Sequence, residues 1–205
     1  MKENNKTEET GKTLTLREAA RQDVAVFGNA RALCFAAMLA AMSLLLGKFL
    51  QIPNPFSQVI RISFENLPVL LAGISMGPLA GAMTGVVADL LGCVLYGYDI
   101  NPIVTLGAAS VGAISGLFAN YVVRRPLLPR VILAVGGAHL CGSVFVKTAG
   151  LAAWYLASFQ MGFWELVAWR ALTYGIIATA EAAILYLLLR HKAFAGVLER
   201  IRKKR

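Results

Sequence analysis

Charged residues are scarce in this chain of 205 residues, where they make up 15% of the sequence, against about 25% in a typical soluble domain. Apolar residues make up 58%, and the mean hydropathy is +0.64. Apolar stretches too long for a water-facing domain have to meet lipid. The composition therefore argues against a disordered chain and a disulfide-rich secreted fold, and it predicts an all-α integral membrane protein.

Cysteine is also rare, with Cys34, Cys93 and Cys141 each inside an apolar run. The number is odd and no pair has the spacing of metal ligands, so we interpret the three as small packing residues. The sequence contains no cluster of metal-ligand residues and no G-x-x-x-x-G-K-[ST] phosphate loop. We therefore expect no metal and no cofactor, and any energised transport has to draw on another subunit or on an ion gradient.

A signal peptide would place an apolar region near the start, whereas the first apolar run here begins only after Arg31. A bilayer core about 30 Å thick requires about 20 apolar residues in a helix. Gly77-Pro78 divides one overlong apolar stretch, because proline removes an amide donor and disfavours helix at the residue before it. We predict a bundle of six transmembrane helices, over residues 32–50, 67–76, 79–97, 103–123, 131–156 and 164–189.

The formal net charge is +9, but the distribution of the basic residues argues against nucleic acid as a partner. Sixteen of the 20 basic residues lie before the first span, between the fourth and fifth spans, or after the sixth. With six spans these regions share one side, and cationic loops favour the cytoplasm. We therefore predict cytoplasmic N- and C-termini and a membrane domain over 31–190, with a basic cytoplasmic tail over 191–205. The first tail, 1–30, fits either a short amphipathic helix on the membrane surface or a partly ordered, solvated segment.

Ionisable residues inside spans are expensive and usually face a protein interior or a wet cavity. Lys147 and Arg170 fall toward the outer ends of their predicted spans, and Arg61 lies in the outer loop before the second span. The three cations are predicted to form an outward-facing pocket for an anionic ligand, because arginine forks onto carboxylates. The alternative is internal pairing, with Asp89 or Glu181 neutralising Lys147 or Arg170. Whether Asp89, Glu181 and also His139 are structural or functional stays open.

Aromatic residues cluster in the predicted outer loops and span ends, and most of them fit an interfacial belt. One or two are expected to stack on a flat ligand ring, and the candidates are Phe56, Tyr98 and Trp154. Small residues also recur at four-residue spacing, with Ala32, Ala36 and Ala40 on one face of the first span. Such stripes let helices approach closely, either within the bundle or against a second membrane protein.

Three stretches of the sequence resemble the substrate-binding S components of energy-coupling factor (ECF) vitamin transporters. They are the alanine-rich opening span, the block Arg61–Pro68 with the glycines that follow it, and Ala88–Gly92 leading into Asn101-Pro102. The Arg61–Pro68 block and the Ala-Asp-x-x-Gly pattern are similar to the folate-specific branch. The resemblance implies a six-helix carrier in the bacterial cell membrane that binds folate or a related vitamin under residues 50–66.

The resemblance also implies partners: a transmembrane coupling protein, docked on the Ala32/Ala36/Ala40 face, and two ATPase subunits that hydrolyse ATP in place of this chain. The predicted substrate-binding residues are Arg61, Lys147, Arg170, Phe56, Tyr98, Asn101 and Trp154. Three alternatives remain: an S component for another vitamin or small anion, an integral membrane enzyme using Ser75 or His139, and a scaffold without a ligand. Ser75 lies in a match to the hydrolase pattern G-x-S-x-G, which requires a strand–turn–helix context.

Overall fold

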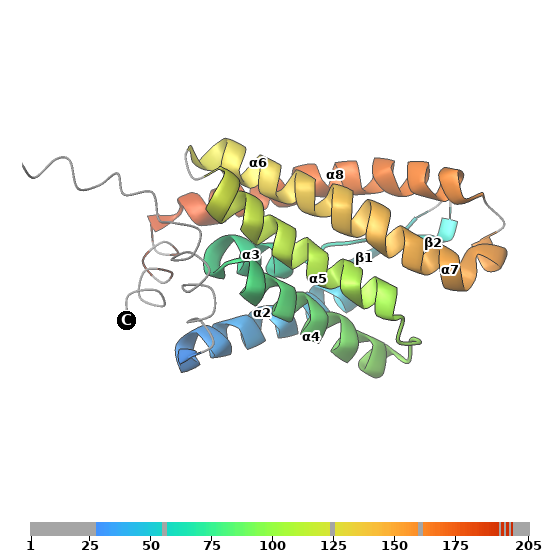
Figure 1. Cartoon of the computed structure of the whole chain (residues 1–205), viewed down its shortest axis with the longest axis horizontal. Helices are drawn as coiled ribbons and strands as arrows, with labels where there is room; N and C mark the ends of the chain where they lie inside the picture. Colours follow the sequence, from blue (N-terminus) through green and yellow to red (C-terminus); the bar gives the residue numbers. More distant parts are fainter. Residues whose placement is uncertain are drawn as a thin grey trace, which may run out of the picture.

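The computed structural model describes residues 28–54, 57–123, 126–159 and 162–192, together with 194, 196 and 198. Its helices lie side by side along one long axis, and a two-stranded hairpin sits near one end (Figure 1). The elements in chain order are α2 (Ala30–Phe49), β1 (Gln51–Asn54), β2 (Ser57–Ser63), α3 (Asn66–Met76), α4 (Pro78–Tyr96), α5 (Pro102–Leu117), the π-helical η3 (Phe118–Val122), α6 (Leu127–Ala138), the π-helical η4 (His139–Val146), α7 (Lys147–Phe159) and α8 (Phe163–Arg190).

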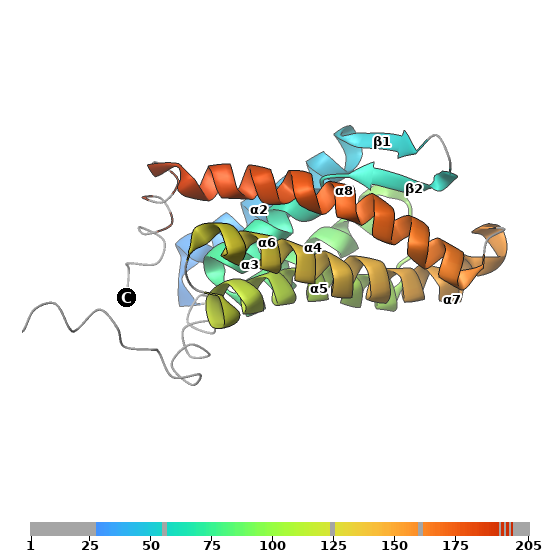
Figure 2. The same cartoon turned by 90° about the horizontal axis from the view of Figure 1, so that it is seen from above.

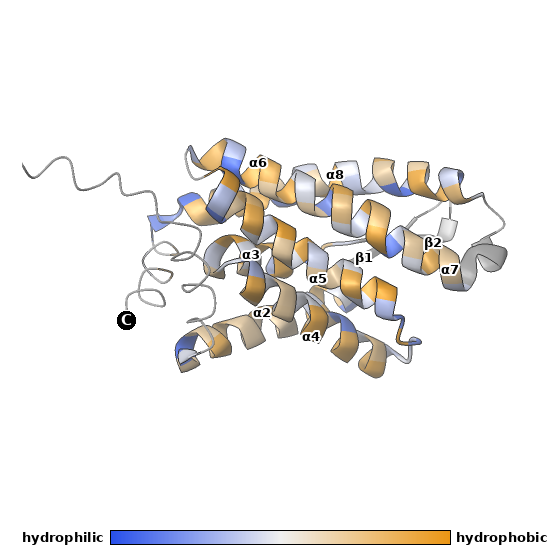
Figure 3. Cartoon of the chain, in the orientation of Figure 1, coloured by the Kyte–Doolittle hydropathy of each residue, from blue (hydrophilic) through white to orange (hydrophobic). Residues whose placement is uncertain are grey.

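Five helical stretches among the described residues are long and apolar enough to cross a membrane. They are α2, α4, α5 with η3, the continuous stretch Leu127–Trp154 and α8, and Figure 3 shows that these helices consist mostly of apolar residues. The remaining apolar helix, α3, has 11 residues, and every one of them is buried. Each of the six predicted apolar segments therefore coincides with helix, and the protein is a helical membrane bundle.

The two ends of the bundle are built differently. The hairpin strands, the α4–α5 connection, the end of α7 and the start of α8 lie at one end, which we call the hairpin end (Figures 1 and 2). The start of α2 and the end of α8 both lie at the opposite end, which we call the terminal end (Figures 1 and 2). The predicted tail 1–30 falls almost wholly outside the described residues, as does most of the tail 191–205.

The segment between α2 and α3 was expected to be a loop, and it contains an antiparallel hairpin instead. Gln51 pairs with Ser63 and Ile52 with Ile62, and the register shifts between Pro53 and Asn54. The β2 sequence Ser57–Ser63 is rich in β-branched residues, which favour an extended backbone. A proline is tolerated in β1 because both strands of a two-stranded sheet are edges.

Helices α4 and α5 approach each other closely along a seam of small residues. A Cβ atom added to Gly112 would collide with the carbonyl oxygen of Gly81, and one added to Gly85 would collide with that of Ala108. Such contacts supply van der Waals packing where lipid gives no hydrophobic drive for helix association. Gly77 joins α3 to α4 with a φ of 109°, a conformation open to glycine and strained for other residues.

The predicted fifth span is one continuous helical stretch that changes its winding in the middle. The chain passes from α6 through the π-helical η4 into α7. Because a π-helix has more residues per turn than an α-helix, the side chains of α7 are rotated about the helix axis relative to those of α6. Single π turns within α-helices occur frequently at functional sites. Here the π-helical segment ends directly before Lys147, the cation that the sequence places in a ligand pocket.

Candidate functional site

A pocket at the hairpin end of the bundle is enclosed by α2, α3, α4, α5 and α7. Its volume is about 110 Å³, and one wall is apolar, with Val69, Ala88 and Ala108. Its polar and ionisable lining residues are Ser43, Glu65, Asn66, Asp89, Cys93, Tyr96, Tyr98 and Lys147. We call this space the hairpin-end pocket, and it contains both carboxylate and ammonium groups.

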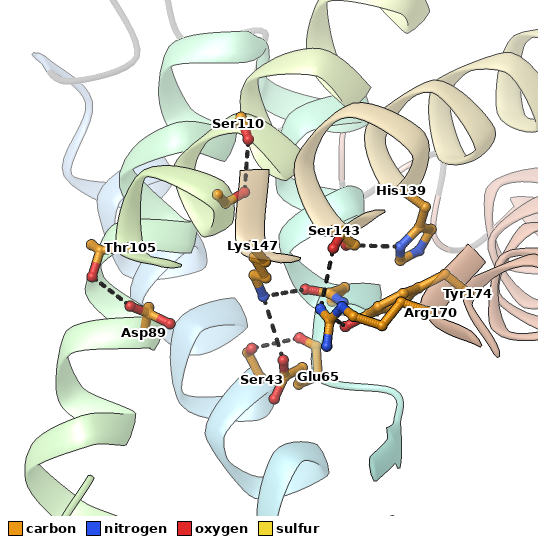
Figure 4. Close-up of polar contacts among 12 residues, drawn as sticks. Ser43, Glu65, Asp89, Thr105, Ser110, His139, Ser143, Lys147, Arg170 and Tyr174 are labelled. Atoms are coloured by element: carbon orange, nitrogen blue, oxygen red, sulfur yellow. Dashed lines mark hydrogen bonds and ion pairs between the residues drawn. The ribbon is translucent and has the colours of Figure 1, made fainter. Parts of the chain in front are cut away.

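Lys147 reaches the pocket from the first turn of α7 and is 7% exposed. Its Nζ atom donates to Glu65 Oε1 at 3.5 Å and to Asn66 Oδ1 at 3.3 Å, as Figure 4 shows for the Lys147–Glu65 pair. The Glu65 side chain is 41% exposed, so solvent weakens its attraction for the ammonium group. The buried amide nitrogen of Asn66 has no hydrogen-bond partner among the described residues. Lys147 is thus buried but only partly neutralised.

Arg170 is 6% exposed and does not line the hairpin-end pocket, but it contacts Thr148, the residue after Lys147. Its Nε atom donates to Thr148 Oγ1 at 2.7 Å, and its Nη2 atom donates to the Ser143 carbonyl at 3.1 Å. The guanidinium carbon lies 5.1 Å from the centre of the Tyr174 ring, a cation–π distance. Among the described residues no carboxylate forms an ion pair with Arg170. A buried cation without a carboxylate is costly, which makes the neighbourhood receptive to an anion.

The other predicted binding residues occupy different positions. Tyr98 lines the hairpin-end pocket, whereas Trp154 is 54% exposed on α7 and lines neither this pocket nor the apolar groove described below. Asn101 is buried, caps α5 by accepting from two backbone N–H groups, and donates to the Gly150 carbonyl at 2.9 Å. Only the backbone of Arg61 is described, in β2 opposite Pro53, and Phe56 falls outside the described residues.

His139 and Glu181 pair inside the bundle. His139 Nε2 lies 2.5 Å from Glu181 Oε2, and its Nδ1 lies 3.1 Å from Ser143 Oγ. These contacts have the order of a Ser–His–acid triad, but all three side chains are buried and line neither the pocket nor the groove. The arrangement gives each ionisable group a partner, which the apolar interior requires.

The serine pattern at 73–77 does not form a nucleophile elbow. Ser75 lies near the end of α3, away from the turn that joins β2 to this helix, and its hydroxyl donates to the Leu71 carbonyl at 2.5 Å. An elbow holds its serine on an exposed strand-to-helix turn. The hydrolase reading of Ser75 therefore has no support in the local geometry.

An apolar groove runs between α2 and α4 at the terminal end of the bundle. Its volume is about 260 Å³, and its lining residues are Ala32, Leu33, Ala36, Ala37, Ala40, Met76, Ala80, Met83, Thr84 and Val87. The residues of the alanine stripe differ in exposure: Ala32 and Ala40 are buried, and Ala36 is half-buried. The neighbouring Ala37 is exposed. The stripe therefore packs α2 against its neighbours and also forms the floor of a smooth, open groove.

The family model for the ECF transporter substrate-specific component matches residues 31–190. The chain belongs to this family. It is 31% identical over 103 residues to the folate transporter FolT of Clostridium novyi (strain NT), in a match covering 50% of this chain and 57% of that protein. The matched region thus spans little more than half of that relative. As a member of a transporter family, the protein is a substrate-binding component and not an enzyme.

Two solved structures share the fold of this S component. A crystal structure of FolT bound with folic acid matches with a TM-score of 0.60 and 23% identity, covering 78% of this chain and 92% of that one. The S component of a bacterial ECF transporter matches with a TM-score of 0.59 and 24% identity, covering 82% and 97%. Identities at this level establish the shared architecture alone.

The predicted binding set omitted several side chains that line the pocket. The sequence identifies Asp89 as an intramembrane carboxylate without assigning it a role, and it gives Glu65 only as part of the Arg61–Pro68 block. Tyr96 is also absent from the predicted set; its hydroxyl donates to the Leu44 carbonyl at 2.5 Å, which fixes the ring beside the pocket. Nothing in the sequence distinguished Asn66 from any other helix-start residue.

Proposed function

We propose that this S component binds folate with high affinity in the hairpin-end pocket and delivers it to an ATP-driven module. The observation that carries the proposal is the pair of buried cations, Lys147 and Arg170, of which Arg170 has no carboxylate partner among the described residues. The glutamyl carboxylates of folate would supply that missing charge. The similarity to a relative named as a folate transporter supports folate over other vitamin anions.

In the proposed arrangement six helices cross or enter the bilayer and both termini face the cytoplasm of a bacterial cell. The hairpin end then faces outward, where the ligand arrives, and β1–β2 forms part of its cover. The pocket volume of about 110 Å³ is below the roughly 300–1,000 Å³ of typical small-molecule sites. A ligand as long as folate would therefore fill the pocket with one part and extend beyond it toward Arg170 and β2.

The proposed partners are a transmembrane coupling protein and two ATPase subunits. The groove over Ala36 and Ala37 supports the first of these, because a smooth apolar surface at the terminal end suits close helix packing within the membrane. Arg61, Phe56, Tyr98, Asn101 and Trp154 remain proposed ligand contacts, with Tyr98 supported by its place in the pocket.

Isothermal titration of the purified chain in mild detergent against a vitamin panel tests the proposal. Folate should bind at nanomolar concentration, and Lys147→Met should weaken it about 10- to 100-fold, as for a lost charge-assisted hydrogen bond. Lys147→Arg should recover part of the loss, and Lys192→Met, at the exposed terminal end, should change nothing. Tight binding of another vitamin without folate binding would replace folate with that vitamin.

A further inference from the structure

Asp89 is a carboxylate that lines the hairpin-end pocket from α4. It is half-buried on α4, and its Oδ2 atom accepts from Thr105 Oγ1 of α5 at 2.6 Å. Among the described residues no cation forms an ion pair with it. A carboxylate accepts about four hydrogen bonds, so the one from Thr105 orients the group and leaves most of its capacity unused.

Asp89 and Lys147 line the same pocket from different helices. Figure 4 shows the Asp89–Thr105 pair on one side of Lys147 and Arg170 on the other. The pocket therefore offers a hydrogen-bond acceptor, Asp89, on one wall and a donor, Lys147, on another. A ligand that bonds to both has a neutral edge rich in N–H donors and a separate part rich in acceptors or negative charge.

An aromatic corner flanks the carboxylate. The Tyr96 and Tyr98 rings lie 6.0 Å apart in an edge-to-face arrangement, and the Leu44 carbonyl holds the Tyr96 hydroxyl. Val69 and Ala108 supply apolar surface in the same pocket. Aromatic and aliphatic walls around an acceptor suit a flat heterocycle that donates hydrogen bonds from its rim.

We propose that Asp89 recognises the amino-pyrimidinone edge of the pterin ring, accepting from the 2-amino group and from the adjacent ring N–H. Thr105 is a positioning residue that fixes the carboxylate through Oδ2. The inference rests on the proposed function, since it assigns the orientation of folate in that pocket: the pterin lies against Asp89 and the glutamyl carboxylates point to Lys147 and Arg170. The site would bind rings that lack the amino group less tightly, because such a ring would cover the half-buried Asp89 carboxylate without donating a hydrogen bond to it.

A purely structural Asp89 would tie α4 to α5 and nothing more. Asp89→Asn separates the two roles, because the amide oxygen still accepts from Thr105 while the amide group presents a donor to the ligand. The ligand-free melting temperature of Asp89→Asn should therefore stay close to that of the unmodified protein. Glu165→Gln, on the exposed first turn of α8, is the matched control for loss of an acid.

The deciding experiment compares folate, a 2-desamino folate analogue and p-aminobenzoyl glutamate by titration calorimetry. Loss of the amino group should weaken binding to the unmodified protein about 10- to 100-fold. Asp89→Asn should weaken folate by a similar factor and show no further loss with the analogue, while p-aminobenzoyl glutamate binds both proteins equally. Thr105→Val should show a smaller loss that is also confined to ligands with the amino group.

Three outcomes would overturn the assignment. Equal affinity of the unmodified protein for folate and the desamino analogue refutes it without any variant, and so does an Asp89→Asn protein that binds folate normally. A loss of the same factor for all three ligands would place Asp89 in the scaffold. If the unmodified protein binds neither folate nor the analogue, the proposed function fails and this inference fails with it.

Discussion

The groove between α2 and α4 provides a direct test of partner docking. Ala37 is exposed and lines the groove, so Ala37→Trp places an indole where a partner helix would lie. Overpacking a close interface costs about 1–3 kcal/mol, which corresponds to roughly 5- to 150-fold weaker association. Ala32 and Ala40 are unsuitable for this test, because both are buried and a bulky side chain there would disturb the fold itself.

The assay measures two quantities for Ala37→Trp: folate affinity of the chain alone, and assembly and uptake after reconstitution with the coupling protein and ATPases. Ala37 does not line the hairpin-end pocket, so folate affinity should stay unchanged while assembly and uptake fall. Ile176→Trp, on the exposed surface of α8, is the control for a bulky residue facing lipid. Normal assembly by Ala37→Trp would refute docking at the groove, and an equal fall in folate affinity would show that the groove and the pocket are not independent.

Two further predictions concern residues whose contacts are internal. Asn101→Ala should lower the melting temperature of the ligand-free protein, since a lost helix cap costs about 0.5–2 kcal/mol and the buried Gly150 carbonyl loses its donor; a change in folate affinity at unchanged stability would instead identify Asn101 as a ligand contact. Glu181→Ala should destabilise the fold by about 1–3 kcal/mol, because the buried Nε2 atom of His139 loses its hydrogen-bond partner, and detergent thermal denaturation that matches the unmodified protein would contradict this.

The helices could be predicted because a bilayer makes hydropathy decisive. Runs of apolar residues fix where the spans lie, and Gly77-Pro78 marks the α3–α4 boundary through backbone chemistry that acts locally. The hairpin was missed although β2 is rich in β-branched residues. A strand of seven residues between two spans gives only a weak sequence signal, because β-propensity depends strongly on the surrounding structure. The π-helical segment η4 was also missed, because hydropathy and residue spacing do not indicate where a helix changes its winding.

The pairing of buried charges could not be predicted, because it depends on contacts between residues far apart in the chain. The sequence identified Lys147, Arg170, His139, Asp89 and Glu181 as intramembrane groups. It offered Glu181 as a partner for one of the two cations, whereas the structure pairs Glu181 with His139. Lys147 instead contacts Glu65, from the segment between β2 and α3. Only the packing of α7 and α8 against the other helices decides between these pairings.

Helices α2 and α4 carry both of the surfaces on which the proposed transport depends. Near their starts, at the terminal end, they form the apolar groove; further along, Ser43 and Gly47 of α2 and Asp89 and Tyr96 of α4 line the hairpin-end pocket. A ligand that contacts α4 at Asp89 therefore acts on the same rigid elements that a partner would contact. A substitution that changes only the groove surface, such as Ala37→Trp, leaves the pocket residues of both helices in place, whereas a ligand that moved α2 and α4 as bodies would also change the groove.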